Sequence, residues 1–537
     1  MSGIGRASVL IGAGTLVSRV TGLLRSIVLV AAIGAAASAD AFNVANQLPN
    51  SIYMIVSTGI LTAVIVPQIV MASRAQDGGQ AFISKLFTLG TVILLAVTAL
   101  AVVAAPLLVN LYASGLPGSQ GFSPEQLELA TTFAYWCLPQ IFFYGLYAIV
   151  GETLNARRIF GPFTWAPIVN NIVSIAGFTL FIVLFGGGQK PVASMTPAMT
   201  TLIGASATLG IVLQAVVLLL FWRRTRLALH ADFRWRGMGL GLIGRLAGWT
   251  FLMVLVGQLA AIVQTNVFAT ASAVHEPGQT IAGNAGLIFI LPYSIIALSI
   301  GTPYFTQLSE HVSAGRHAEV PRDISTSVRV TALLIVLSTA ALAAAAVPVS
   351  RVFTTSSDQA VDAALVLGAY LVGLVPIGIL FTVQRTFYAY NDTRTPFFFT
   401  LVQAAIAAGL AAAALALPPE IRAAGVALGQ SVSILVQVIL ATILLRRKVG
   451  ALRVRVWMLS LARFVAAAIP AGAAGWLTFE LLGGVDGWTA SSVVLGALGT
   501  VVIGGVTAVV YFALLALLRT PELAPVGTLL RRFLPTR

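Results

Sequence analysis

The sequence predicts an all-α polytopic membrane protein, and three observations support this fold class. Hydrophobic residues make up 58% of the 537 residues and charged residues only 9%, against roughly 25% charged residues in a soluble domain. The mean hydropathy is +0.96. The apolar residues also gather into long runs that short polar segments separate. These observations exclude a soluble enzyme, a disordered chain and a coiled coil.

The apolar runs predict about fourteen transmembrane helices, because a helix needs roughly 20 apolar residues to cross the hydrocarbon core. The break between the first two runs, around Gly34 to Asp40, is the least polar. The expected spans are residues 9–33, 42–71, 86–113, 127–154, 163–185, 199–222, 246–273, 281–308, 329–350, 361–389, 397–417, 424–445, 464–482 and 491–518.

The distribution of Lys and Arg orients these spans. The chain carries 31 basic and 17 acidic residues, a net charge of +14. With both termini in the cytoplasm, about 26 of the basic residues fall on the inner side, as the positive-inside rule requires. Lys190, Arg351 and Arg422 would lie outside, and Arg19 and Arg25 within the membrane. The first run lacks the uninterrupted apolar centre of a secretory signal, so we expect it to be retained as a span.

A repeat relates the two halves of the chain. Three pairs of similar segments recur in the same order, about 234 to 243 residues apart. An Ala- and Leu-rich chain can also produce such pairs by chance. The pairs are LPNSI (48–52) with LPYSI (291–295), LNARRIFGPF (154–163) with YAYNDTRTPF (388–397), and Pro139 with Pro376.

The repeat predicts two pseudo-symmetric six-helix bundles around a central cavity, plus two C-terminal helices. Six spans per repeat is an even number, so both halves share one orientation in the membrane. The expected divisions are residues 1–226, 227–448 and 449–537, the last comprising the two additional helices and a short cytoplasmic tail. We further expect Pro49 and Pro292 to break equivalent helices at the rim of the cavity.

Enzyme chemistry has little support in the sequence. No GxxxxGK[ST] phosphate loop is present, and the GxGxxG match at 239–244 follows a basic loop where a dinucleotide site needs a strand. The four histidines lack metal-ligand spacing. The single cysteine, Cys137, lies in an apolar run, which indicates a buried bystander. The prediction is a protein that is not an enzyme and has no metal or cofactor.

Two arginines at membrane depth are the strongest candidates for binding a substrate. If the first helix begins near Ser8, Arg19 and Arg25 lie roughly 16 and 26 Å along it. A central arginine costs about 2.5–3.5 kcal/mol on insertion scales and normally faces a cavity or a partner. Its planar fork matches phosphate oxygens. The alternative is a structural ion pair with Asp40 or Glu152.

Other polar residues near or within the spans form a weaker candidate set. In the second span, Asp40 and the nearby amides either line a cavity or cap a helix. In the seventh span, the amides either contact substrate or join helices. In the fourth span, the polar residues form either a gating ion pair or a snorkelling helix end. They are Asp40, Asn43, Asn46, Gln47 and Asn50 in the second span, Gln258, Gln264 and Asn266 in the seventh, and Glu152, Asn155, Arg157 and Arg158 in the fourth.

Several motifs resemble those of the MurJ-type (MviN) lipid II flippases of the multidrug/oligosaccharidyl-lipid/polysaccharide exporter superfamily. The resemblance extends over all the expected spans, and its first block is the most specific. The segments that carry it are SRVTGLLR (18–25), ADAFNVANQLPN (39–50), VPQ (66–68), LNARRIFGPFTWAPIVNNI (154–172) and FYAYNDTRTPF (387–397).

The resemblance implies a flippase that moves lipid-linked peptidoglycan precursor (lipid II) from the inner to the outer leaflet by alternating access. It would act in peptidoglycan biosynthesis, cell wall biogenesis and cell shape, as a multi-pass protein of the bacterial cytoplasmic membrane. Its partners would be an undecaprenyl-pyrophosphate-linked precursor, membrane lipids and cell-wall synthesis proteins, with no nucleic acid. The candidate substrate-binding residues are Arg19, Arg25, Asp40, Asn46, Asn50, Tyr53, Gln258 and Asn266, and the candidate gating residues are Glu152 and Arg157.

This chain departs from the family pattern at several charged positions. Ser26 stands where the family usually has an acidic residue, Ser51-Ile52-Tyr53 where it has an arginine, and residues 284–287 lack another arginine. The alternatives are a drug or cation antiporter, an exporter of another polyprenyl-linked saccharide, or a non-transporting scaffold. An antiporter would need a deep carboxylate, whereas Asp40 and Glu152 lie near span ends.

Overall fold

The computed structural model describes residues 3–57, 79–157, 159, 161–234 and 240–523, and their regular secondary structure is entirely helical. Thirteen helical segments in this part of the chain are long and apolar enough to cross a membrane. They coincide with thirteen of the fourteen expected spans. The second expected span begins as a helix, and its C-terminal part, 58–71, lies outside the described residues. The predicted all-α polytopic fold is confirmed.

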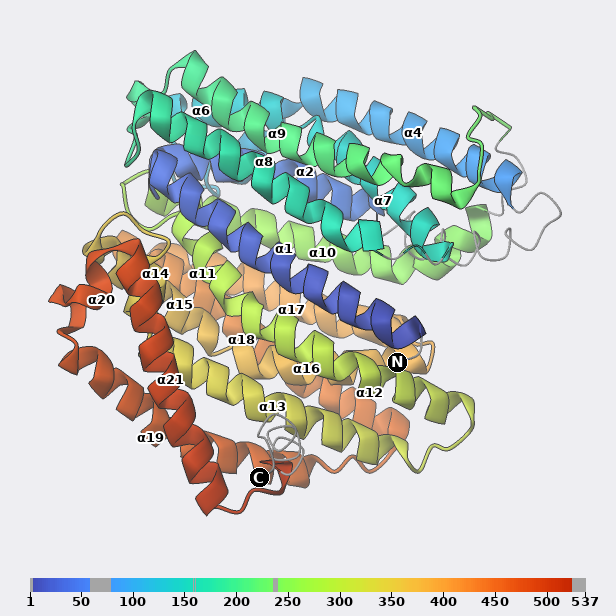
Figure 1. Cartoon of the computed structure of the whole chain (residues 1–537), viewed down its shortest axis with the longest axis vertical. Helices are drawn as coiled ribbons and strands as arrows, with labels where there is room; N and C mark the ends of the chain where they lie inside the picture. The colour runs from blue at the N-terminus through green and yellow to red at the C-terminus, as the bar shows by residue number, and fades with distance from the viewer. Residues whose placement is uncertain (1–2, 58–78, 158, 160, 235–239, 524–537) are drawn as a thin grey trace, which may run out of the picture. The chain divides into compact units, whose positions relative to one another are not determined.

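The chain divides by packing into two compact units, residues 1–280 and 281–537. In the first unit α8 packs along both α1 and α9, and α2 packs on α6 and α7 (Figure 1). Its helices are α1 (Gly3–Ile33), α2 (Ala37–Ser57), α4 (Gln80–Val103), α5 (Ala105–Ala113), α6 (Pro124–Cys137), α7 (Gln140–Ala156), α8 (Gly161–Phe185), α9 (Pro197–Leu220) and α10 (Leu240–Ser272).

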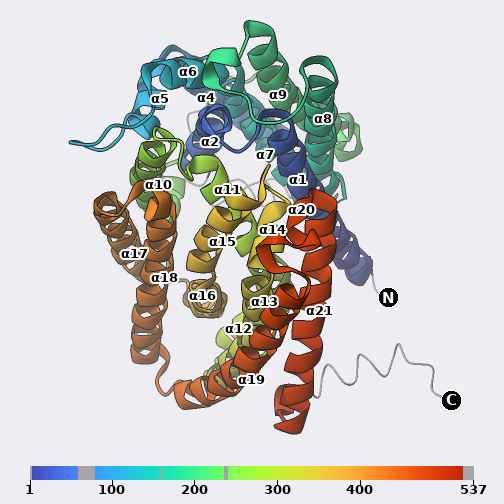
Figure 2. The ribbon, with the colours of Figure 1, turned by 90° about the vertical axis from the view of Figure 1, so that its left-hand side faces the viewer.

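The second unit contains a bundle and the two additional C-terminal helices. Long helices α19 and α21 pack against each other and against α13 (Figure 2). Its helices are α11 (Gln279–Pro292, beginning at the end of the first unit), α12 (Leu298–Ser313), α13 (Val320–Ala344), α14 (Ala346–Arg351), α15 (Ser357–Leu371), α16 (Leu374–Ala389), α17 (Arg394–Ala413), α18 (Pro419–Val449), α19 (Val454–Leu481), α20 (Trp488–Ser491) and α21 (Val493–Leu517).

Besides the eighth span, four expected spans are pairs of helices, and their breaks follow the repeat. The third and ninth spans break at Ala104 and Ala345, and the fourth and tenth break at residues 138–139 and 372–373. Proline lies at or near each break, as Pro106, Pro348, Pro139 and Pro376. Proline cannot donate the helical hydrogen bond and clashes with the preceding turn. The repeated prolines therefore interrupt the corresponding helix in each half.

The expected break at Pro49 is wrong, whereas the one at Pro292 is present. Helix α2 continues through Pro49 to Ser57. Helix α11 ends at Pro292 and passes into a π-helical turn, Tyr293–Ala297, before α12 begins. The Ser294 hydroxyl donates to the Leu291 carbonyl at 2.9 Å, which satisfies a backbone group near the irregular turn. The two equivalent prolines thus have different consequences for the backbone.

The boundary between the packed units differs from the boundary that the repeat suggests. By the repeat, α10 would open the second half at residue 227, yet it packs on α2 and α5 in the first unit. The division at 226, like that at 448, stays a prediction of the sequence repeat.

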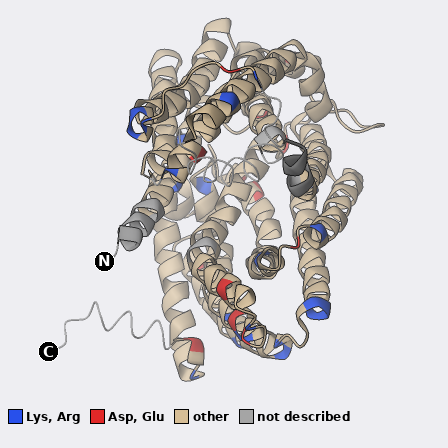
Figure 3. Ribbon diagram, turned by 90° about the vertical axis from the view of Figure 1, so that its right-hand side faces the viewer, with Lys and Arg blue, Asp and Glu red and all other residues tan. Residues whose placement is uncertain are grey.

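Aromatic packing and sparse charge characterise the interior of each unit. The buried ring of Phe42 meets those of Phe133 and Phe178 edge to face, with centroids 5.2 and 6.3 Å apart. Figure 3 shows that Lys, Arg, Asp and Glu occupy few positions along the helices. Because a charge within a membrane span is costly, each buried charge is expected to have a partner or to face a cavity.

Candidate functional site

Arg25 on α1 is half-buried and has no structural partner among the described residues. It forms none of the ion pairs that the structure contains there. It lies within electrostatic range of the Tyr144 hydroxyl on α7. The Tyr144 ring stacks on Tyr53 of α2, with centroids 5.5 Å apart and planes inclined by 26°. The structure therefore places two predicted residues, Arg25 and Tyr53, beside a tyrosine that the sequence analysis missed.

A polar contact with α8 sets the orientation of α1. The Asn171 side chain donates to the Ser18 carbonyl at 3.1 Å and to the Thr21 hydroxyl at 2.9 Å. At about 100° per residue, Ser18, Thr21 and Arg25 share one face of the helix within roughly 60°. Asn171 thus turns the face that carries Arg25 toward the rest of the unit.

Arg19 has a different environment from Arg25. Its side chain is exposed, and six residues of helix place it about 120° around the axis from Arg25. The structure does not bring the two arginines onto one face.

Asp40 caps a distant helix and does not pair with Arg25. It is 1% exposed, and its carboxylate accepts from the Thr280 backbone N–H at 2.6 Å, in the first turn of α11. Asn43 donates to the Thr280 hydroxyl at 2.9 Å. A side chain on Gly278 would begin only 2.1 Å from the Asp40 carboxylate. The capping alternative therefore describes Asp40, although the capped helix is α11 and not its own.

Asn266, deep in the seventh span, joins helices of the first unit. Its amide donates to the Leu111 carbonyl at 2.7 Å and the Ile262 carbonyl at 2.9 Å, and its oxygen accepts from Gly115 N–H at 2.9 Å. Its hydrogen bonds thus tie α10 to the end of α5. This geometry agrees with the interhelical alternative.

Three further amides of the candidate set, Asn46, Asn50 and Gln258, have weaker contacts. Gln140, which the sequence analysis also missed, donates to Asn46 at 3.4 Å and to the Thr208 hydroxyl at 2.9 Å. Asn50 is exposed, and both Asn50 and Gln258 approach the Met54 sulfur, at 3.9 and 3.8 Å. Their polar groups leave room for a ligand more readily than those of Asn266.

The two candidate gating residues lie at the C-terminal end of α7. Glu152 is half-buried and hydrogen-bonds with Asn155. Arg157 ends the helix as its C-cap residue. The ion pairs between described residues do not include Glu152. Gating by these residues stays a prediction.

A charged cluster in the second unit was not recognised in the sequence. His311, at the end of α12, lies 2.5 Å from Asp323 through Nδ1 and 3.1 Å from Glu319 through Nε2. Gln307 donates to the other Asp323 oxygen at 3.2 Å. The cluster fastens α12 to α13. No group of three or more His, Cys, Asp or Glu in the described part of the chain could hold a metal ion.

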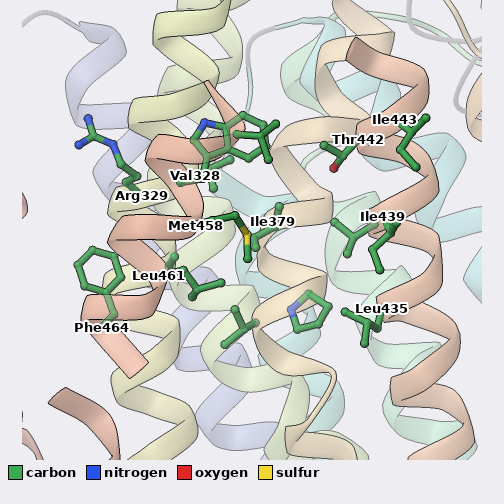
Figure 4. A pocket seen from close by; sticks show the side chains of 16 residues that line it. Val328, Arg329, Ile379, Leu435, Ile439, Thr442, Ile443, Met458, Leu461 and Phe464 are labelled. Atoms are coloured by element: carbon green, nitrogen blue, oxygen red, sulfur yellow. The ribbon is translucent and has the colours of Figure 1, made fainter. Parts of the chain in front are cut away.

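A cavity of about 450 Å³ lies between α13, α16, α18 and α19 of the second unit. Its walls are apolar apart from Thr442, Trp457 and Arg329. In Figure 4 the Arg329 guanidinium points away from the apolar side chains, and it donates to Glu522 at 2.7 Å. Such a cavity fits hydrocarbon and offers little to a charged headgroup.

Comparison with known proteins assigns the chain to a transporter family. The family model "Lipid II flippase MurJ" matches residues 29–496. The chain belongs to the MurJ family. A probable lipid II flippase MurJ of Rhizobium meliloti is 26% identical over 486 residues, 88% of this chain and 87% of the relative. The lipid II flippase MurJ of Burkholderia cenocepacia is 29% identical over 404 residues, 73% of this chain and 74% of the relative.

Solved structures support the MurJ fold. A lipid II flippase MurJ in an inward closed conformation superimposes with a TM-score of 0.72 at 20% identity, over 94% of this chain and 99% of the other. An inward-facing MATE family transporter of the MOP superfamily gives 0.65 at 16% identity, over 81% and 95%. These likenesses concern the fold. The MurJ assignment confirms the resemblance found in the motifs and identifies a multi-pass membrane protein of a transporter family, not an enzyme.

Proposed function

We propose that this chain is a flippase that moves lipid II from the inner to the outer leaflet of the bacterial cytoplasmic membrane by alternating access. The observation that carries the proposal is the half-buried Arg25, which stands without an ion-pair partner among the described residues. The family match over residues 29–496 supports it.

The chemistry of the substrate explains what Arg25 would do. A pyrophosphate crossing hydrocarbon unaided would lose its hydration at a large cost in free energy. A guanidinium is always charged and can donate two parallel hydrogen bonds to phosphate oxygens. The Tyr144 hydroxyl lies within electrostatic range of the guanidinium, and the ring of Tyr53 stacks on that of Tyr144. We infer that Arg25 replaces part of the water lost from the pyrophosphate.

The lipid tail needs no polar site. The polyprenyl chain would stay in the bilayer, and the apolar cavity of the second unit offers hydrocarbon contact to such a chain. We propose that headgroup and tail use separate parts of the protein.

The proposed topology places both termini in the cytoplasm, with two six-helix halves and two further spans. The asymmetry of Lys and Arg supports it. Reporter fusions after Gly115, Gly188, Pro277 and Gly484 should be external, and those after Arg226 and Lys448 internal. A fusion on the opposite side would overturn this topology.

The function is tested with purified protein in vesicles that contain fluorescent lipid II. We expect the full chain to accelerate the exposure of lipid II on the opposite leaflet, and a strain depleted of its own flippase to grow when this chain is supplied. A drug or cation antiporter would leave lipid II in place and export another solute. A scaffold would move neither lipid II nor another solute. Either the antiporter result or the scaffold result would refute the proposal.

A further inference from the structure

Arg385 lies near the inner end of a membrane span of the second unit. It is half-buried on α16, four residues before this helix ends at Ala389. In the sequence it counted only as one of the many basic residues of the cytoplasmic side. Its surroundings are unlike those of a solvated charge.

Two phenyl rings flank the guanidinium of Arg385. Its central carbon lies 5.2 Å from the ring centroid of Phe305 on α12 and 5.3 Å from that of Phe381 on α16. Cations are attracted to aromatic faces at these distances. Tyr293 and Tyr388 lie within electrostatic range of the same charge. The arginine is therefore held among aromatic side chains.

The sequence of α12 allows this arrangement. Gly301 faces Phe381 so closely that a Cβ atom would lie 2.2 Å from the ring. Nearby, Ser327 of α13 and Thr382 of α16 share a hydrogen bond of 3.0 Å. The close approach at Gly301 and this hydrogen bond fix the ring against which the guanidinium rests.

Aromatic rings hold the charge without using its hydrogen-bond donors. A guanidinium has five N–H groups and no acceptor. Within the described residues, Arg385 has no ion pair and no hydrogen bond. Asp323 borders the same small cavity, but its two oxygens are occupied by His311 and Gln307. The donors of Arg385 are thus available to an external anion.

Other buried or half-buried arginines of the second unit contrast with Arg385. Arg351 donates to the carbonyls of Ala490, Thr354 and Ser491 at 2.9, 2.7 and 3.2 Å. Arg329 donates to Glu522 at 2.7 Å. These two guanidinium groups connect parts of the protein. A structural role of that kind is not found for Arg385.

We propose that Arg385 is an anion-binding residue that grips phosphate oxygens of the lipid-linked headgroup as it enters from the inner leaflet. This inference rests on the proposed flippase function. The cavity beside Arg385 has a volume of about 10 Å³, which holds about one water molecule. The anion therefore binds at its mouth, against the edge of the guanidinium, and not within it.

Ordinary membrane phospholipids offer the same phosphate chemistry, so the experiment separates the two sources. The full chain is placed in nanodiscs of zwitterionic phosphatidylcholine, with and without phosphatidylglycerol. Binding of lipid II is measured for the unaltered protein, Arg385→Ala, Arg385→Lys and a control, Arg447→Ala. Arg447 is an exposed cation of the same unit, at the end of α18.

We expect Arg385→Ala to weaken lipid II binding by about ten- to a hundred-fold, because charge-assisted hydrogen bonds are lost. Arg385→Lys keeps the charge but loses the planar guanidinium with its parallel N–H donors. Its lipid II affinity should lie between those of Arg385→Ala and the unaltered protein. Arg447→Ala should bind lipid II normally. The difference in lipid II affinity between Arg385→Ala and the unaltered protein should be the same with and without phosphatidylglycerol. Thermal unfolding verifies that each variant is folded.

Unchanged lipid II affinity in folded Arg385→Ala would overturn the inference. A loss of lipid II affinity seen only in nanodiscs that contain phosphatidylglycerol would overturn it as well. If Arg385→Ala does not fold, the lysine variant decides, since full affinity there would refute recognition by the fork. Failure of the unaltered protein to flip lipid II would instead refute the proposed function. The two failures are therefore distinguishable.

Discussion

The two units stabilise their interiors by different means. In the first unit, uncharged amides and hydroxyls join the helices, as Asn266 and Asn171 do. Of the ion pairs between described residues, only Arg234 with Asp232 lies there, in a loop. The second unit also has such uncharged bonds, as between Ser327 and Thr382, but adds contacts between ionisable side chains, as in His311 with Asp323 and Arg329 with Glu522. Because the ion pair between described residues of the first unit lies in a loop, the half-buried Arg25 without an ion-pair partner there is informative.

The largest effect is expected from removing Arg25. The variant Arg25→Ala should lower lipid II flipping by about ten- to a hundred-fold, because charge-assisted hydrogen bonds to pyrophosphate are lost. Arg25→Lys should be less impaired. Flipping in vesicles and membrane protein abundance are measured together. Abundance should stay normal, since Arg25 leaves no partner unpaired among the described residues.

Arg223→Ala is the matched control, because Arg223 is an exposed arginine of the same unit. It should flip lipid II normally. A normally abundant Arg25→Ala protein with full activity would refute the substrate-binding role and remove the contrast between the units.

In contrast to Arg25, removal of Arg351 should lower stability and leave flipping activity unchanged. Arg351→Ala leaves the carbonyls of Ala490, Thr354 and Ser491 without their donor. We expect the free energy of unfolding to fall by about 3 kcal/mol, while the folded fraction keeps its flipping activity. Thermal unfolding in detergent measures the first quantity. Exposed Arg316 is the control, and equal stability of Arg351→Ala and Arg316→Ala would contradict a structural role.

A smaller loss is expected at Asn266. Interhelical hydrogen bonds in membranes contribute about 0.6 kcal/mol each on average, so Asn266→Ala should cost about 1–2 kcal/mol. Asn50→Ala, at an exposed position whose amide only approaches the Met54 sulfur, should cost almost nothing. Unfolding of the two variants is compared directly. A larger cost at Asn50 would show that the uncharged contacts of α10 do not hold the first unit together.

The smallest effect is expected at Asp392, in the loop before α17. Burial would raise the pKa of this carboxyl, but hydrogen bonds from Lys448, at 2.5 Å, and Thr395, at 2.9 Å, hold the pKa below its ordinary value. A lowered pKa means that the carboxylate stabilises the fold above about pH 4 and stops doing so as pH falls through the lowered pKa. Asp392→Asn should therefore cost about 1 kcal/mol or less at pH 7.

The difference between Asp392→Asn and the unaltered protein should shrink below about pH 4. Thermal unfolding at pH 7, 5 and 3.5 measures it. A stability difference that grows as pH falls would contradict a lowered pKa for Asp392.

Hydropathy predicted the spans because each must satisfy its backbone internally and present apolar side chains to lipid. The same pattern could not locate the breaks, since the residues around Ala104 and Ala345 are as apolar as their neighbours. Proline positions were the available signal.

The site was less predictable than the fold. Arg25 could be found because a charge in an apolar run is rare. For Asp40 the sequence left a cavity role and a helix cap open, and it could not show the partner, because Thr280 is distant in the sequence. Tyr144 and Arg385 gave no signal, since an aromatic residue in a span and an arginine near its end are both common.

The π turn at Tyr293–Ala297 corrects the helical phase of the eighth span. Buried positions of α11 include Ala282, Ala285 and Phe289, and those of α12 include Leu308 and His311. Counted at 100° per residue, the second group would lie roughly 80° around the axis from the first. The extra residue of a π turn rotates the next helix back by about 100°, so both buried stripes face nearly the same side. Deleting one residue from this turn would rotate α12 relative to α11, whereas substituting the same residue would not.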